Sequence, residues 1–170
     1  MKVGFVGTHG TGKTTDAYAL AHHLKLHGYD VKVLTGAARD CPLPINEQAT
    51  LESQMWIFAE ILRREIESKA DITICDRTVL DTFAYLYRLF PQESEQAVGL
   101  ALLWFNTYDV VFWKRTTEYL CVDGVRPTDK QFQLDIDAII EKFIRQYQLF
   151  VIEENDAQKQ LEVVERHYYC

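Results

Sequence analysis

A glycine-rich stretch near the start of the chain, "GTHGTGKTT" at residues 7–15, has the residue types and spacing of a phosphate-binding loop. Gly7, Gly10 and Gly12, with the lysine and threonine that follow, match the pattern G-x-x-x-x-G-K-[ST] in full. Glycines allow backbone conformations that turn successive N–H groups inward, and the start of a helix adds partial positive charge. We therefore expect a polyphosphate to contact Gly7, Thr8, His9, Gly10, Thr11, Gly12, Lys13, Thr14 and Thr15.

Two side chains of this loop have separate expected roles. Lys13 would reach the β- and γ-phosphates of ATP and serve catalysis, and Thr14 would place its hydroxyl on Mg²⁺. His9 occupies a variable position and is interpreted as a spacer within the ATP site, not as a base. A glycine turn that merely joins a strand to a helix is the alternative, and the full match in that context argues against it.

An acid and a base end a second apolar run, "ITICDR" at residues 72–77. An acid at the end of such a strand orients the metal or its water shell, so Asp76 joins Thr14 as a predicted Mg²⁺ ligand. Arg77 stands where ATPase motors usually carry a second carboxylate that polarises water. Its cation would hold an anion or neutralise charge on a transferred phosphoryl group, which favours transfer over hydrolysis. A surface ion pair at a strand end remains the alternative.

The acceptor side offers two chemistries. A hydroxyl acceptor needs a carboxylate base, and Asp40 in "ARDCP" is the first candidate, although a turn-forming role before the proline-rich loop stays open. A phosphate acceptor needs arginines instead, and Arg39, Arg77 and Arg88 could clamp it. The sequence leaves both chemistries open.

The helix expected over residues 47–69 could supply the pocket for a nucleobase. Gln54 would hydrogen-bond the edge of the base, whereas Trp56 and Phe58 are more typical of a core face than of a stacking partner. Asp81 and Tyr85 lie one helical turn apart after "DR" and could face the acceptor, although Asp81 could also cap its helix.

Composition restricts the class of protein. The chain has 170 residues, 48% of them hydrophobic, which suits one compact domain over residues 1–170. Twenty-five acidic and 18 basic residues give a net charge of −7, which disfavours a broad nucleic-acid-binding face. The four cysteines form no metal-binding or disulfide pattern. No signal peptide or membrane-length apolar run is present, so the expected location is cytoplasmic with no membrane partner.

Strand and helix patterns alternate along the chain. They predict a three-layer α/β/α fold around a five-stranded parallel sheet, in which ligands bind beyond the carboxyl ends of the strands. The expected strands cover residues 3–6, 30–35, 72–75, 108–113 and 149–153. The expected helices cover residues 13–27, 47–69, two segments within 78–106, 135–147 and 156–166.

The chain resembles the P-loop kinases of nucleosides and nucleotides in four stretches, "GTHGTGKT", "CDRTVLDTFAY", "RDCPLPIN" and "DGVRPTD". Among these kinases it is most similar to small proteins of the AAA group that are related to the nicotinamide riboside kinase domain. The likeness runs from residue 1 to about residue 153. It implies a P-loop NTPase fold in which the third strand lies beside the first. It also implies a short lid over residues 114–130, with Arg126 as a catalytic arginine on the ATP phosphates and Lys114 and Arg115 as helpers. A solvated turn with a helix cap at Asp129 remains the alternative for "DGVRPTD".

The leading hypothesis is an ATP- and Mg²⁺-dependent kinase of a nucleoside-like or nucleotide small molecule. A second hypothesis is a kinase of a modified base or hydroxyl within DNA or another polynucleotide, for which a narrow groove could be formed by Arg39, Arg63, Arg64, Arg77 and Arg88. A third is a nucleotide-dependent switch or AAA-type ATPase. Donor preference, oligomeric state and the role of the C-terminal "ERHYYC" cannot be read from the sequence.

Overall fold

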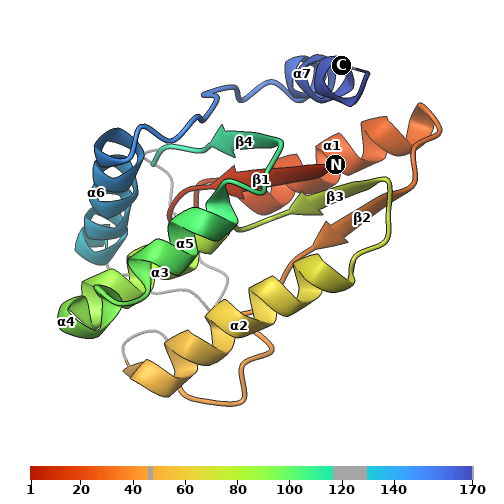
Figure 1. Cartoon of the computed structure of the whole chain (residues 1–170). Helices are drawn as coiled ribbons and strands as arrows, with labels where there is room; N and C mark the ends of the chain where they lie inside the picture. Colours follow the sequence, from red (N-terminus) through yellow and green to blue (C-terminus); the bar gives the residue numbers. More distant parts are fainter. Residues whose placement is uncertain (46–47, 117–129, 170) are drawn as a thin grey trace.

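A four-stranded parallel sheet forms the centre of the molecule (Figure 1). The structure is a computed structural model that describes residues 1–45, 48–116 and 130–169. The strands lie in the order β2-β3-β1-β4, so the third strand lies beside the first, as the resemblance implied. Their bounds are β1 Lys2–Val6, β2 Val31–Leu34, β3 Ile72–Cys75 and β4 Val110–Trp113.

The fifth strand expected over residues 149–153 is wrong. Only Ile152 pairs with the sheet, through an isolated parallel bridge to Phe112. Beyond it the Glu154 carboxylate accepts the backbone N–H groups of Asn155 and Asp156, each at 2.8 Å. These local bonds turn the chain toward the next helix, so the segment cannot continue the strand ladder.

Helices cover both faces of the sheet, because each central strand is apolar on both sides. One face packs against α1 and α7 and the other against α2, α3, α5 and α6 (Figure 1). The helices are α1 Lys13–Leu26, α2 Leu51–Glu67, α3 Val79–Leu89, α4 Pro91–Ser94, α5 Val98–Phe105, α6 Lys130–Gln146 and α7 Ala157–Tyr168. Within the described residues, none of them is long and apolar enough to cross a membrane.

Several helices differ from the expected ones, and two of the differences have local reasons. Helix α2 begins at residue 51 because Thr50 and Ser53 form a reciprocal capping box there. The segment 78–106 contains three helices instead of two, since Pro91 starts the short α4 before α5. The end of the chain packs on α1, where Glu165 contacts His27 and Tyr169 accepts a hydrogen bond from Tyr29.

Close packing fixes the start of the phosphate-binding loop. Gly7 follows β1 with φ 150°, and a Cβ added there would lie 2.2 Å from the carbonyl oxygen of Lys114. The Lys114 amide donates to the Val6 carbonyl at 2.8 Å, so the two chain segments are held together at this point. No side chain fits between them.

Gly7→Ala is therefore expected to lower the free energy of unfolding by at least about 3 kcal/mol, since the backbone must shift. Gly28→Ala is the matched control, because Gly28 has φ 90° but open space around it. It should cost only about 1 kcal/mol, the conformational penalty alone. Urea unfolding followed by circular dichroism measures both, and equal losses would contradict the packing argument.

Candidate active site

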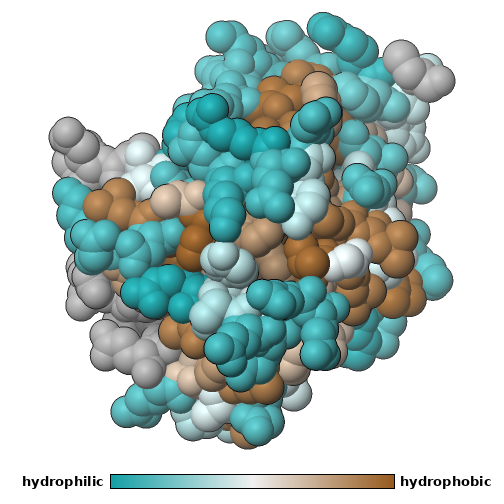
Figure 2. Space-filling view, turned by 60° about the vertical axis from the view of Figure 1, so that its left-hand side comes forward, coloured by the Kyte–Doolittle hydropathy of each residue, from teal (hydrophilic) through white to brown (hydrophobic). Residues whose placement is uncertain are grey.

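A cavity of about 350 Å³ lies at the carboxyl ends of the strands, where parallel sheets bind ligands. Figure 2 turns this side of the molecule toward the viewer and shows apolar surface framed by hydrophilic side chains. The lining comes from five segments of the chain. These are residues 9–15, residues 36–39 with Ile45, Gln54 and Ile57 of α2, Asp76 with Arg77, and Thr82, Tyr85 and Leu89 of α3.

The phosphate-binding loop is preformed. Gly10 and Gly12 have φ values of 77° and 84°, in the left-handed region that favours glycine. The buried Lys13 ammonium donates to the Thr8 carbonyl and lies 3.3 Å from the hydroxyl of Thr11. These contacts hold the lysine across the loop at the N-terminus of α1, so backbone N–H groups, helix dipole and ammonium converge where a polyphosphate would bind.

Seven of the nine predicted loop residues line the cavity, and Gly7 and Thr8 do not. Both lie beneath the loop. The Gly7 amide donates to Asp81 at 3.0 Å, and Thr8 is fully buried with its carbonyl directed to Lys13 and Thr11. Their contribution is to shape the loop.

The predicted metal ligands are brought together. The Thr14 hydroxyl, in the first turn of α1, donates to Asp76 Oδ2 at 2.8 Å. The parallel pairing of β1 with β3 places the two residues side by side although 62 positions separate them. Among the residues that the structure describes, no three His, Cys, Asp or Glu side chains form a ready-made metal site. A hydroxyl and one carboxylate beside a phosphate-binding loop suit Mg²⁺, because phosphate oxygens and water usually fill the rest of its coordination shell.

Arg77 and Tyr85 form one wall of the cavity. The Arg77 guanidinium lies 5.5 Å from the centre of the Tyr85 ring, and the Tyr85 hydroxyl is 2.9 Å from His9 Nδ1. Burial opposes the charge of Arg77, but the influence of Tyr85 and Asp81 is stronger and raises the pKa of the guanidinium. Tyr85 was expected to face the acceptor, and it lines the cavity.

His9 is more than a spacer. It is 1% exposed, and its ring is bound to Tyr85. Its carbonyl accepts a hydrogen bond from the buried Gln133 amide of α6 at 2.7 Å. The residue at this variable position of the loop therefore ties the loop to α3 and α6, a role that a single sequence could not indicate because both partners are distant in the chain.

Asp81 caps α3 and does not line the cavity. Its carboxylate is fully buried and accepts hydrogen bonds from the Thr78 amide at 2.8 Å, the Thr78 hydroxyl at 2.7 Å and the Gly7 amide. Burial raises the pKa of this carboxyl, while Lys13 and Arg77 nearby oppose that effect. The capping alternative is the one that the structure supports. Asp81 also binds the phosphate loop to the helix that follows Arg77.

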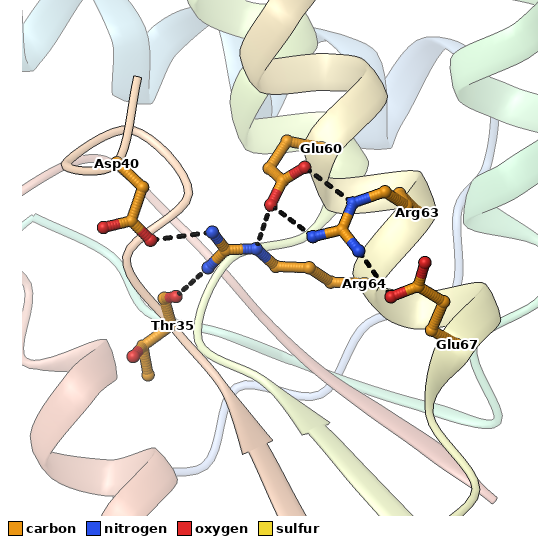
Figure 3. Close-up of polar contacts among 6 residues, drawn as sticks. All are labelled: Thr35, Asp40, Glu60, Arg63, Arg64 and Glu67. Carbon is orange, nitrogen blue, oxygen red and sulfur yellow. Dashed lines mark hydrogen bonds and ion pairs between the residues drawn. The ribbon is translucent and has the colours of Figure 1, made fainter. Parts of the chain in front are cut away.

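The predicted base, Asp40, lies away from the cavity. Its side chain is 59% exposed, and its carboxylate pairs with Arg64 Nη2 at 2.7 Å (Figure 3). Arg64 also donates to the Thr35 carbonyl and to Glu60, both at 2.7 Å. The arginine thereby anchors the loop after β2, so residues 36–39 form the cavity wall while Asp40 faces outward.

Two arginines of the predicted nucleic-acid groove, Arg63 and Arg64, form ion pairs with acidic residues. Arg63 contacts Glu60 and Glu67 on the exposed side of α2 (Figure 3). Hydrogen bonds from Arg63 and then Arg64 lower the pKa of Glu60 to about 2. Arg88 pairs with Asp135 at 2.9 Å and does not line the cavity. Arg63, Arg64 and Arg88 are thus each paired with acids. Arg64 also lines a small second pocket together with Arg77.

Some of the remaining predicted residues line the cavity and others do not. Arg39 and the buried Gln54 line the cavity, whereas Phe58 lies in the core, as its spacing indicated. Lys114 is buried against Asp16 and Asn155, and Arg115 pairs with Glu141. Arg126 and most of the predicted lid lie outside the described residues.

Several lining residues, most of them apolar, were missed by sequence reasoning. Ile57 lies one turn after Gln54 on α2, and Thr82 and Leu89 lie one turn before and after Tyr85 on α3. The helical spacing of three or four residues from a suspected site residue could have identified them. Ala37, Ala38 and Ile45 belong to a loop and carry no such signal.

Comparisons with known proteins agree with this architecture. The profile of a family described as AAA domain matches residues 2–160. No curated protein matches. Among solved structures, the NadR protein in complex with NR superposes with a TM-score of 0.78 and 17% identity over 99% of this chain and 52% of that one. The chain thus spans about half of NadR.

Two further solved structures match along nearly their whole length. Thymidylate kinase from Ehrlichia chaffeensis has a TM-score of 0.69 and 19% identity, over 96% of this chain and 97% of that one. Deoxyadenosine kinase from M. mycoides has a TM-score of 0.63 and 16% identity, over 98% and 97%. The fold is therefore the one found in P-loop nucleoside and nucleotide kinases, and the resemblance indicated by the motifs is confirmed.

Asp81→Ala is expected to lower the free energy of unfolding by about 3 kcal/mol, because it leaves the buried amides of Gly7 and Thr78 without their acceptor. Asp135→Ala is the control, since it removes an aspartate from a partly exposed helical ion pair with Arg88. That change should cost less than about 1 kcal/mol. Urea unfolding measures both variants. Similar stabilities would show that Asp81 does not hold the loop to α3.

Proposed function

We propose that this chain, which belongs to the AAA domain family, is an ATP- and Mg²⁺-dependent phosphotransferase that acts on a nucleoside-like or nucleotide small molecule. The observation that carries the proposal is the contact of Thr14 with Asp76 at the mouth of a preformed phosphate loop. Arg77, the next residue, lines the same cavity. Donor phosphates, metal and acceptor would therefore meet at one place.

The donor side has the parts that nucleotide binding requires. Backbone N–H groups of the loop and the Lys13 ammonium would bind the β- and γ-phosphates. Thr14 and Asp76 would hold Mg²⁺, which neutralises phosphate charge and orients the γ-phosphoryl group when bound. The fixed position of Lys13 means that little reorganisation is needed when charge develops.

The residues around the γ-phosphate position favour transfer over hydrolysis. Among the described residues that line the cavity, Asp76 is the only carboxylate, and it is already bonded to Thr14. No second described carboxylate is therefore placed to activate water. Apolar side chains of Ile57, Ala37 and Leu89 form part of the wall and would help exclude solvent from a bound acceptor. Arg126 remains the proposed lid arginine.

The solved structures with the same fold support this class. The M. mycoides deoxyadenosine kinase is described with bound dATP, and NadR with NAD and AMP-PNP. At 16–19% identity these relatives share the fold, so the activity itself rests on the residues of this site.

The test incubates the protein with Mg²⁺, ATP and pooled nucleosides, nucleoside monophosphates, nicotinamide riboside or DNA oligonucleotides, and detects phosphoryl gain by mass spectrometry. A small molecule should gain one phosphoryl group, and Lys13→Ala should reduce the rate by about 100-fold or more, since it removes a charge from the transition state. Lys142→Ala is the matched control on the exposed side of α6.

Two outcomes would contradict the proposal. Phosphoryl gain on oligonucleotides alone would favour the polynucleotide kinase. Accumulation of ADP with no phosphorylated acceptor would favour a nucleotide-dependent switch or ATPase.

A further inference from the structure

Cationic side chains outnumber carboxylates among the described residues that line the cavity. The described lining contains the cations Lys13, Arg39 and Arg77 and a single carboxylate, Asp76. In the proposed function, Lys13 and Asp76 are committed to the donor phosphates and their metal. Arg77 therefore places positive charge on the acceptor side, which favours an anionic acceptor.

No described carboxylate is placed to activate a hydroxyl acceptor. Asp76 is bonded to Thr14, Asp81 is buried beneath Gly7, and Asp40 faces outward in its pair with Arg64. A sugar hydroxyl is a weak nucleophile that benefits from such a base. A phosphate oxygen is already ionised at neutral pH and needs none.

Arg77 has the geometry of an anion ligand. Its guanidinium offers five N–H donors in a plane, which suits bidentate binding of phosphate. In the described part of the chain it forms no ion pair within 4 Å, and its guanidinium lies against the Tyr85 ring. The hydroxyl of Tyr85, 2.9 Å from His9 Nδ1, lies on the same wall. With His9 Nδ1–H as the donor in that bond, the Tyr85 hydroxyl keeps its own proton for a further hydrogen bond.

The opposite wall differs in character. Gln54 is buried on α2, with Ile57 one turn further along the helix. A carboxamide beside apolar side chains can bind the edge and the faces of a planar heterocycle. The cavity thus has one cationic wall that suits a phosphate and an opposite wall that suits a nucleobase, and a nucleotide carries both groups.

We propose that the acceptor is a nucleoside monophosphate, whose phosphate is bound by Arg77 and Tyr85, and not an uncharged nucleoside. This inference rests on the proposed function. In the reaction an acceptor phosphate oxygen bonds to the γ-phosphorus of ATP, and the bond from that phosphorus to the β,γ-bridging oxygen breaks. The electron pair leaves with ADP, the product is a nucleoside diphosphate, and no proton has to be removed from the acceptor.

The test compares kcat/KM for matched pairs of acceptors, each nucleoside against its own 5′-monophosphate, with Mg²⁺ and ATP. The monophosphate should be preferred by about 100-fold or more, because a site that binds an anion is left unpaired by the neutral analogue. Arg77→Gln and Arg77→Lys should each lower kcat/KM for the monophosphate by at least about tenfold, mainly through KM, and change the value for the nucleoside little.

Arg145→Gln is the control, because Arg145 lies on the exposed side of α6 and pairs with Glu141. Circular dichroism of each variant checks the fold, and retention of the nucleoside rate shows that the donor site is intact. A preference for the nucleoside would overturn the inference and leave the kinase proposal standing. Equal losses for both acceptors would also overturn it, because Arg77 would then act on the transferred group. Phosphorylation of neither acceptor would reject the kinase proposal as well.

Discussion

The parallel register between β1 and β3 is the constraint on which the site depends. Gly4 pairs with Cys75, so the phosphate loop that follows β1 and the Asp76–Arg77 pair that follows β3 leave the sheet at the same edge. The strands bring the phosphate loop and the residues after β3 to one edge of the sheet, but they do not fix the relative positions of the two segments. Those positions are fixed by Asp81, which joins the Gly7 amide to the start of α3, and by the Thr14–Asp76 bond. The phosphate loop is thus bonded to the start of α3 and to the end of β3, which would reduce reorganisation on ligand binding.

Two polar clusters of the protein differ in how their groups are satisfied. The buried Glu65 carboxylate of α2 accepts hydrogen bonds from Lys2, Trp104 and Tyr108 at 2.6–2.9 Å. This network is satisfied within the protein and adds rigidity. At the carboxyl ends of the strands, Lys13 and Arg77 line an open cavity instead. The contrast separates a structural polar cluster from one arranged to bind a ligand.

The features of the site that depend on the backbone could be predicted from the sequence. The interaction partners of individual side chains could not. The phosphate loop, Asp76 and the neighbouring strands follow from glycine positions, apolar runs and the rules of parallel sheets. Asp40 and Arg88 were expected at the acceptor because their neighbours in sequence suggested it. Their actual partners, Arg64 and Asp135, come from helices distant in the chain. The fifth strand failed for a local reason, because Glu154 captures backbone amides just after Ile152, and the exposed Phe150 shows how little of the segment is buried.

The most direct measurement of the central claim is a crystal structure of the protein with Mg²⁺ and a non-hydrolysable ATP analogue. The account predicts the triphosphate wrapped by residues 9–15, with Mg²⁺ on the Thr14 hydroxyl and Asp76 reaching it directly or through water. It also predicts that the γ-phosphate faces the wall formed by Arg77 and Tyr85. A metal bound away from Thr14 and Asp76, or a γ-phosphate directed away from Arg77, would contradict the account.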